Sequence, residues 1–529
     1  MAISSHDKEA KTTDHVEALT FELDAIDTLR GVAALKVAER LEPVQKLSKG
    51  MVQLYVICGF MFLGASLGGY DASLMGNLMA MPFFQAEFDA QILGAKTGLI
   101  SSMYSIGAVS ALPFVGPCGD TWGRRPGIAL GCVIVIIGTV IQGTSHHLPQ
   151  YLAGRFFLGF GGTVASVVPA YIVEIAHPTY RGVIGGLYNC CYYVGSVLAA
   201  IVLRGCVGYQ SNQSWLIPTW FQMALPSILL ISIFFFPESP RWQFSHGQVE
   251  KCRASLIKYH GNGDSESLYV KLQLREFAEE LELNGADKRW WDYRTLFNSR
   301  ASLYRVILCA VSVPAFSQWT GQAGVSYFLP AMLSTMGVTS TLVVLDINLG
   351  LAVASGIAAC IGASCMDFFG RRKTLITCCL VLVVMWAGML ACTGTFNASG
   401  SDSSARASIA FIFLVGISFS FGYTPLQQLY AVEVLRYEQR AKGIAFAAMM
   451  MSGASLVNLF ATPIALEKIA WKTYYVWLAA CAAQAIYYYF FMVETKGHTL
   501  EEMNYIFNQK NPKKASLEYK DNIIEGTKG

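Results

Sequence analysis

The sequence predicts an all-α membrane protein with twelve transmembrane helices in two related, pseudo-symmetric six-helix bundles. Three observations lead to this fold class. The composition is strongly apolar, uncharged runs long enough to cross a bilayer recur along the chain, and the same polar motifs appear in both halves. Of the 529 residues, 53% are hydrophobic and 14% are charged. Soluble proteins carry about 25% charged residues, so this chain has too little charge to solvate an ordinary globular surface.

Each predicted span is an uncharged run of the length that a membrane helix needs, about 20 mostly apolar residues. The first six runs cover residues 51–70, 97–116, 126–145, 151–173, 182–203 and 215–236. The second six cover residues 306–335, 342–366, 374–396, 407–432, 443–465 and 473–493. The chain then divides into an N-terminal tail (1–50), a first bundle (51–240), a linker with short helices (241–305), a second bundle (306–493) and a C-terminal tail (494–529).

The distribution of basic residues predicts the orientation in the membrane. Lysine and arginine gather in both tails, in the linker and in two Gly-Arg-Arg turns, whereas the loops between them hold few. By the positive-inside rule, both termini are expected in the cytoplasm. The two Asn-x-Ser sequons, at Asn212 and Asn397, then fall in outward-facing loops and are candidate glycosylation sites.

Composition and motifs exclude several classes of function. With 39 Lys+Arg against 36 Asp+Glu, the net charge of +3 supplies no basic field for nucleic acid. The sequence contains no metal-ligand spacing, no phosphate-binding loop and no nucleophile elbow. We therefore expect no metal, no cofactor, no nucleic-acid partner and no enzymatic activity. Most of the 14 cysteines lie in apolar runs and are expected to be reduced, packing thiols.

Three polar motifs recur in the same order, offset by about 250 residues, as a duplicated six-helix unit requires. An acid before a Gly-Arg-Arg turn, an acid seven residues before an arginine, and an acid at the end of the sixth span each occur twice. A single copy would be explained equally well as a positive-inside anchor. Two copies favour an ionic latch that breaks as the protein opens inward. Its candidate residues are Asp120, Arg124, Arg125, Glu174, Arg181, Glu238, Arg241, Asp367, Arg371, Arg372, Glu433, Arg440 and Glu494.

From about residue 50 to residue 507, these motifs resemble the sugar porter family of the major facilitator superfamily. The resemblance rests on Gly154-Arg155, on Pro-Glu-Ser-Pro-Arg-Trp at 237–242, on the two Gly-Arg-Arg turns and on Glu-Thr-Lys-Gly at 494–497. Finer features, including Gly69-Tyr70-Asp71 and Thr-Pro-Leu-Gln at 424–427, are similar to the fungal lactose and cellodextrin permease branch. The resemblance implies the major facilitator fold, a monomer in the plasma membrane, and a sugar and a proton as partners.

Two intramembrane charges are candidates for proton coupling. Asp71 is expected to close the first span and Arg155 to lie near the start of the fourth, and a charge at membrane depth is a functional hypothesis by default. A neighbouring guanidinium lowers the proton affinity of a carboxylate, and desolvation after separation raises it. The resemblance implies symport, because this acid marks proton-coupled members. A static ion pair and an interfacial acid in water are the alternatives. Asp346, near a helix terminus, is expected to be solvated.

A sugar site needs amides for the hydroxyls and an aromatic face for the ring. In the seventh span, Gln318 and Gln322 are expected to share one helical face, with Trp319 and Tyr327 capping the site. The resemblance adds Asn189, at a position where the family often has Gln, and Gln428, where it has a hexose-stacking tryptophan. For any single amide in a span, a hydrogen bond that packs two helices together is as good an explanation as contact with a ligand. The candidates are Asn189, Gln318, Trp319, Gln322, Tyr327, Gln427, Gln428 and Asn458.

The resulting hypothesis is proton-coupled import of a sugar by alternating access. The sugar is a disaccharide such as lactose or a cellodextrin, or a hexose. Three alternatives stay open: an uncoupled facilitator, which would tolerate Asp71→Asn; a sugar sensor that signals through its tails; and an exporter of a specialised metabolite, since fold does not fix function.

Overall fold

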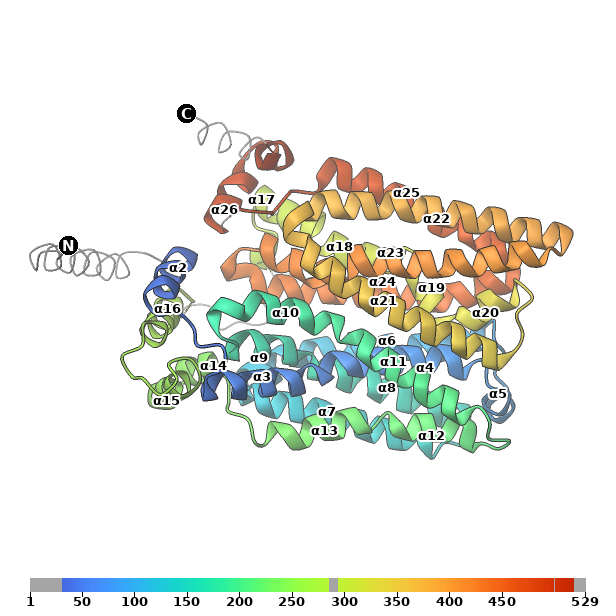
Figure 1. Ribbon diagram of the computed structural model, residues 1–529, viewed down its shortest axis with the longest axis horizontal. Coiled ribbons are helices and arrows are strands. Elements are labelled where there is room, and N and C mark those ends of the chain that lie inside the picture. The colour runs from blue at the N-terminus through green and yellow to red at the C-terminus, as the bar shows by residue number, and fades with distance from the viewer. Residues whose placement is uncertain (1–30, 285–293, 499, 518–529) are drawn as a thin grey trace, which may run out of the picture.

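The computed structural model describes residues 31–284, 294–498 and 500–517, and within these ranges the regular elements are helices (Figure 1). Within these described ranges, eleven helical segments are long and apolar enough to cross a membrane. The eleventh, Lys442–Phe491, contains two helices joined by the short 3-10 turn Ala470–Thr473. Each of the twelve predicted spans therefore lies largely on helix, and the predicted fold class is confirmed.

The first half contains six spans, several of which consist of two consecutive helices. They are α3 (Lys49–Met61) with α4 (Leu63–Leu78), α6 (Ala95–Pro117), α7 (Arg124–Gly143), α8 (Leu148–Val164) with α9 (Val168–Ile175), α10 (Arg181–Cys190) with α11 (Tyr192–Cys206), and α12 (Gln213–Phe221) with α13 (Ala224–Ile233). The short helix α5 (Pro82–Phe88) follows the first span.

Glycines allow the helices of this half to cross at very short distances. A Cβ atom on Gly69 of α4 would lie 1.8 Å from the Tyr192 carbonyl oxygen, and one on Gly195 of α11 would lie 1.9 Å from the Ser66 carbonyl oxygen. The crossing of α6 and α8 depends in the same way on Gly107 and Gly159. Small residues at helix contacts are typical of membrane proteins, where close backbone approach replaces the hydrophobic effect.

The second half is built in the same order with longer helices. Its seventh span runs through α17 (Arg300–Leu303), the π-helix η5 (Tyr304–Val311), α18 (Ser312–Ser317), α19 (Gln322–Tyr327) and α20 (Leu329–Ser334). The following spans are α21 (Thr341–Phe369), α22 (Arg371–Ser399), α23 (Asp402–Val434), α24 (Tyr437–Ile469) and α25 (Tyr474–Phe491).

Two expectations about individual spans are wrong. The first span continues to Leu78 rather than ending near residue 70, so Asp71 lies inside a helix. The seventh span is not one helix: the chain leaves helical geometry between Ser317 and Gln322, where Gly321 has a φ of +92°. Because only glycine adopts such a φ without strain, the sequence places the break there.

Five short helices lie at one end of the bundles, which we call the linker end (Figure 1). They are α2 (Gly31–Leu41), α14 (Pro240–Ser245), α15 (Val249–Tyr259), α16 (Leu268–Asn284) and α26 (Leu500–Asn508). Glu42 fastens the segment after α2 to the start of α16, because its carboxylate accepts hydrogen bonds from Ser267 Oγ (2.7 Å) and Leu268 N (2.8 Å). A carboxylate at a helix N-terminus satisfies backbone donors that would otherwise be unpaired.

The two halves touch closely at the end opposite the linker helices. A Cβ atom on Gly76 of α4 would lie 2.4 Å from the Ser326 carbonyl oxygen of α19, and one on Gly98 of α6 would lie 2.8 Å from the Phe460 carbonyl oxygen of α24. Arg204 of α11 also forms an ion pair with Asp346 of α21 at 2.5 Å. The structure is therefore closed at this end.

Candidate functional site

The most buried ion pair joins the first and fourth spans. Asp71 of α4 is 4% exposed and Arg155 of α8 is 1% exposed, and Arg155 Nη1 donates a hydrogen bond to Asp71 Oδ1. Gln222 Nε2, from the sixth span, donates to the same oxygen at 2.8 Å. The ring of Tyr104 lies 5.4 Å from the Arg155 guanidinium carbon, a cation–π contact. Because Asp71 is buried inside its helix, the alternative of an interfacial acid in water is wrong.

This ion pair leaves several buried polar atoms without a hydrogen-bond partner among the described residues. They include Asp71 Oδ2 and both Nε and Nη2 of Arg155. Buried charges are normally fully hydrogen-bonded, and unpaired ones are costly. The ion pair between Asp71 and Arg155 is therefore incompletely satisfied by its surroundings.

A narrow cavity lies between the two halves, close to this pair along α4. Its volume is about 30 Å³, and a cavity needs only about 10–15 Å³ by this measure to hold one water. The site must therefore widen before a larger ligand enters. It is lined by α4, α11, α19 and α21, through Ser73, Tyr192, Tyr193, Ser196, Gln322, Ser326, Asn348, Leu351, Ala352 and Ser355.

The lining of this cavity is uncharged and rich in hydroxyl groups. Asn348 Nδ2 donates to Ser73 Oγ at 3.1 Å and so connects the two halves across it. Gln322 Nε2 donates to Ser326 Oγ at 3.3 Å, whereas Gln322 Oε1 and Ser355 Oγ are buried without a partner in the described chain. Such unsatisfied groups offer hydrogen bonds to a hydroxylated ligand.

Among the predicted sugar contacts, Gln322 lines the cavity. The expectation that Gln318 and Gln322 share a helical face is wrong, because the break at Gly321 separates them. Trp319 is 49% exposed and donates its indole N–H to the Ala454 carbonyl at 3.2 Å. It therefore contributes nothing to the cavity wall. Tyr327 is partly buried, next to the close contact between α4 and α19.

The remaining predicted amides connect helices to one another. Asn458 Nδ2 donates to the Gln318 carbonyl at 2.5 Å, and Gln427 Nε2 donates to Ser317 Oγ at 2.7 Å. Asn189 Nδ2 donates to the Thr424 carbonyl at 2.5 Å, which links the first half to the second. The side chain of Gln428 lies outside the described part of the structure.

Sequence reasoning missed most of the cavity wall, namely Ser73, Ser196, Asn348 and Ser355. One signal could have revealed part of it: Asn348, Ala352 and Ser355 are spaced four and seven residues apart in an otherwise apolar span. That spacing places small or polar side chains along one helical face.

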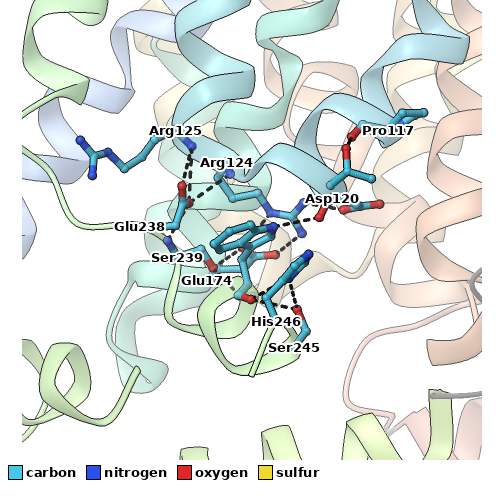
Figure 2. Close-up of polar contacts among 11 residues, drawn as sticks. Pro117, Asp120, Arg124, Arg125, Glu174, Glu238, Ser239, Ser245 and His246 are labelled. Atoms are coloured by element: carbon cyan, nitrogen blue, oxygen red, sulfur yellow. Dashed lines mark hydrogen bonds and ion pairs between the residues drawn. The ribbon is translucent and has the colours of Figure 1, made fainter. Parts of the chain in front are cut away.

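Five of the seven predicted latch residues of the first half lie together at the linker end, namely Asp120, Arg124, Arg125, Glu174 and Glu238 (Figure 2). Arg124 donates two hydrogen bonds to Glu174, at 3.0 and 2.9 Å, and forms an ion pair with Asp120 at 2.5 Å. Ser239 Oγ also donates to Glu174, at 2.6 Å. The Glu238 carboxylate accepts hydrogen bonds from the backbone N–H groups of Arg124 (3.0 Å), Arg125 (3.2 Å) and Ser239 (2.9 Å). Burial raises the pKa of Glu238 above its ordinary value.

The second half repeats this cluster. Arg371 binds Glu433, with Nη2 at 2.7 Å from Oε1, and Thr495 Oγ1 donates to the same carboxylate at 2.5 Å. Glu494 accepts from the backbone N–H groups of Arg371 (2.9 Å) and Arg372 (3.2 Å), as Glu238 does in the first half.

The glycine of each Gly-Arg-Arg turn is required by its geometry. Gly123 and Gly370 have φ angles of +109° and +87°. In each, a Cβ atom would lie 2.7 Å from an oxygen of Glu238 or Glu494, respectively. The glycine thus lets the acid of the sixth span approach the start of the next helix.

The second arginine of each turn binds backbone carbonyls: Arg125 donates to Ile233 and Phe234, and Arg372 donates to Tyr489. Arg181 begins α10 and Arg241 lies in α14. The side chains of Asp367 and Arg440 lie outside the described residues. These hydrogen bonds and ion pairs join segments of the same half, so each cluster holds one bundle together.

The two sequons differ in their surroundings. Asn212 is partly buried and its Nδ2 donates to Glu87 Oε2 at 2.9 Å, while Ser214 of the same sequon is 4% exposed. Asn397 is exposed in the last turn of α22, although its Nδ2 donates to the Thr393 carbonyl at 2.8 Å. Asn397 is therefore the more accessible candidate.

The profile of the family described as "Sugar (and other) transporter" matches residues 57–507. The chain belongs to this family of membrane transporters. Its predicted membership in the sugar porter branch of the major facilitator superfamily is confirmed, and with it a multi-pass membrane protein. The finer resemblance to lactose and cellodextrin permeases stays a prediction.

Similar proteins carry several different names. The high-affinity glucose transporter of Kluyveromyces lactis is 27% identical, over 88% of this chain and 87% of its own. The MFS-type transporter criB of Aspergillus cristatus is 26% identical, over 85% and 91%. Among solved structures, the partially occluded, inward-open form of the xylose transporter XylE from E. coli matches with a TM-score of 0.70 and 19% identity. It covers 84% of this chain and 99% of XylE. This last match shows the fold alone.

Proposed function

We propose that this protein imports a neutral sugar together with a proton, by alternating between outward-open and inward-open states. The observation that carries the proposal lies in α4, where Asp71 and Ser73 are two residues apart. Asp71 pairs with Arg155 inside the first half, and Ser73 bonds to Asn348 of the second half in the cavity. One helix thus joins the candidate proton site to the candidate sugar site.

The proton acts on the ion pair. The Asp71–Arg155 ion pair holds α4 against α8 in this structure. Protonation removes the charge that holds Arg155, which releases α4 and with it Ser73. Proton entry down its gradient supplies the free energy for sugar accumulation.

The sugar binds in the cavity between the halves. Hydroxyl and amide groups there match the donors and acceptors of a polyhydroxylated solute, and Tyr192 and Tyr193 supply aromatic faces. The absence of charge among the lining residues favours a neutral solute. The substrate class is supported by the family's description, by the glucose transporter relative and by the solved proton:xylose symporter of the same fold.

The linker end faces the cytoplasm, as the basic residues of the linker and of the two Gly-Arg-Arg turns favour. The plasma membrane is the location that the resemblance to sugar porters implies. The protein works as a monomer, because both candidate sites are formed within one chain.

Uptake of labelled mono- and disaccharides by transporter-null yeast, with external pH recorded, tests the proposal. Wild-type protein should accumulate one or more sugars above the external concentration and alkalinise the medium. Asp71→Asn, at normal surface abundance, should lose both effects. Asp89→Asn is the matched control, because Asp89 is a fully exposed loop acid paired with Lys96.

The alternatives predict different outcomes. Equilibration without accumulation, unaffected by Asp71→Asn, would replace symport by facilitated diffusion. Absence of sugar uptake by surface-localised protein would contradict the proposal and favour a sensor or an exporter. The criB relative is named a transporter, which favours transport of another solute over a sensor.

A further inference from the structure

Tyr193 makes the closest hydroxyl contact between the two halves near the cavity. It is 8% exposed, belongs to α11 and lines the cavity. Its hydroxyl lies 2.6 Å from Ser420 Oγ and 3.3 Å from Thr424 Oγ1, both on α23 of the second half. Ser420 Oγ donates its own proton to the Gly416 carbonyl at 2.7 Å. The Tyr193 hydroxyl is therefore the donor to Ser420, and it accepts from Thr424.

A second bond joins the same two spans about one turn earlier in the fifth span, where Asn189 lies in α10. Asn189 Nδ2 donates to the Thr424 carbonyl at 2.5 Å. The side chain expected to bind sugar thus reinforces the contact made by Tyr193. On the adjacent helix α21, Gly356 allows close packing, because a Cβ atom there would lie 3.0 Å from Tyr193 Cβ.

The order of residues along the fifth span, which comprises α10 and α11, places this contact between the cavity and the cytoplasm. The fifth span starts at the linker end and reaches the opposite end at Cys206. Ser196 and Tyr193 both line the cavity, and Tyr193 is the one nearer the linker end. Asn189 precedes Tyr193 by about one helical turn, in α10, and so lies still nearer the cytoplasm. On the other side of the cavity the halves are closed by α4 against α19.

We propose that Tyr193 is the inner gate residue and that it connects sugar occupancy to opening of the cytoplasmic exit. This inference rests on the proposed function. A sugar hydroxyl in the cavity replaces Ser420 as the acceptor of the Tyr193 proton, and the bond across the halves is lost. Without sugar the bond holds, so the carrier does not open inward with a proton alone.

Removing the hydroxyl group tests this role in proteoliposomes that contain the purified full-length chain. Tyr193→Phe should raise sugar-independent proton entry about fivefold, the effect of losing one buried hydrogen bond, and should lower sugar accumulation. Tyr475→Phe removes a hydroxyl from a tyrosine that is 56% exposed on α25 and serves as the matched control. Proton entry by Tyr193→Phe equal to that of wild type would overturn the proposal.

Cross-linking tests the gate without relying on hydrogen-bond energies. Because the contact is made by the end of the tyrosine ring, a direct disulfide between residues 193 and 420 is too short, since it requires Cα atoms within about 7 Å. In Tyr193→Cys/Ser420→Cys, a bis-methanethiosulfonate reagent with a spacer about as long as the ring should join the two thiols, each thiolate displacing methanesulfinate to form a disulfide with the reagent, and a reductant should reverse this. The cross-link should stop sugar uptake until it is reduced. Wild type, with its 14 cysteines, and each single variant are the controls. No cross-link in surface-localised double variant would overturn the gate, whereas absence of sugar uptake by wild type would instead contradict the proposed function.

Discussion

The ion cluster of the first half and that of the second half use the same parts in the same order. Each cluster contains an arginine that follows a glycine with a positive φ. Each also contains an acid from the fourth span of its half, and an acid after the sixth span that accepts hydrogen bonds from backbone N–H groups. They differ in what surrounds them. The carboxylate partner is 8% exposed in the first half (Glu174) and 23% exposed in the second (Glu433).

The covers of the two clusters come from different parts of the chain. In the first half, Trp242 of α14 donates to the Asp120 carbonyl at 2.8 Å, so the linker lies on the cluster. In the second half, the C-terminal segment contributes Ser516, whose hydroxyl accepts from Glu494 N at 3.4 Å. The duplication therefore preserved the turn and the ion pair, while the linker and the tail cover the two copies independently.

The largest predicted difference concerns the central arginines. Arg124→Ala leaves Glu174 buried without its partner, which costs about 3–5 kcal/mol of stability. Arg371→Ala should cost less, because Glu433 has more access to water. Thermal unfolding of both variants in the same detergent measures the difference. An equal or larger loss for Arg371→Ala would contradict the role assigned to burial.

The two turn glycines should behave alike, because their geometry is the same. Gly123→Ala and Gly370→Ala each force a side chain into a positive φ and against a carboxylate. Strain of this kind costs about 1–3 kcal/mol. Gly116→Ala, where a Cβ would meet nothing within 4 Å, is the control. A large effect at only one turn, measured by thermal unfolding, would show that the clusters are not equivalent.

The packing of the linker helices α15 and α16 against the first half should be sensitive to acid. His177, before the fifth span, and His260, after α15, lie with ring centroids 5.3 Å apart. Burial and then the neighbouring His260 and Arg181 lower the pKa of His177 to about 3. Burial also lowers the pKa of His260 to about 4, although its Nε2 bonds to the Ile175 carbonyl at 3.0 Å.

These depressed pKa values set the direction of the pH effect. A histidine that is neutral when docked contributes fully above its ordinary pKa of about 6.5 and loses that contribution as the pH falls toward 4. The equilibrium constant for docking of α15 and α16 should therefore fall about tenfold per histidine for each pH unit below 6.5. Hydrogen exchange of these helices at pH 7.5 and 5.5 measures it, with His260→Gln as the variant that should lose part of the dependence. Equal protection at both pH values would contradict it.

The smallest effect is expected at the rim of the first cluster. Asp120 contacts Arg124, but its side chain is 66% exposed. Exposed ion pairs contribute about 0.2–1 kcal/mol, so Asp120→Asn should lower stability by about 0.5 kcal/mol. The same thermal unfolding measurement checks this, and a loss comparable to that of Arg124→Ala would contradict it.

The features that follow from local sequence were predictable. The spans follow from apolar runs, and the latch clusters follow from a repeated motif in which the turn brings the arginine to its acid. The Asp71–Arg155 pair was predictable because so few charges lie at membrane depth that each has few possible partners.

The sugar cavity was less predictable, because the orientation of an amide depends on how two helices are placed against each other. Asn189, Gln427 and Asn458 carry the right chemistry, yet neighbouring backbone and hydroxyl groups take up their hydrogen bonds. The break at Gly321 separates Gln322, which lines the cavity, from Gln318, whose amide donates to Ser317 Oγ. The prediction from periodicity assumes that the helix continues through this position. Ser355 was missed because an isolated serine in a span gives no signal until its neighbours are known.

The central claim is that one carboxylate couples sugar movement to proton movement, and the ratio of the two fluxes tests it most directly. Wild-type protein and Asp71→Asn would be reconstituted in proteoliposomes, with labelled sugar and a pH-sensitive dye measured together. The account predicts a fixed number of protons per sugar for wild type. For Asp71→Asn it predicts sugar exchange without proton movement or accumulation. Accumulation of sugar by Asp71→Asn against its gradient, with an unchanged ratio, would contradict the account.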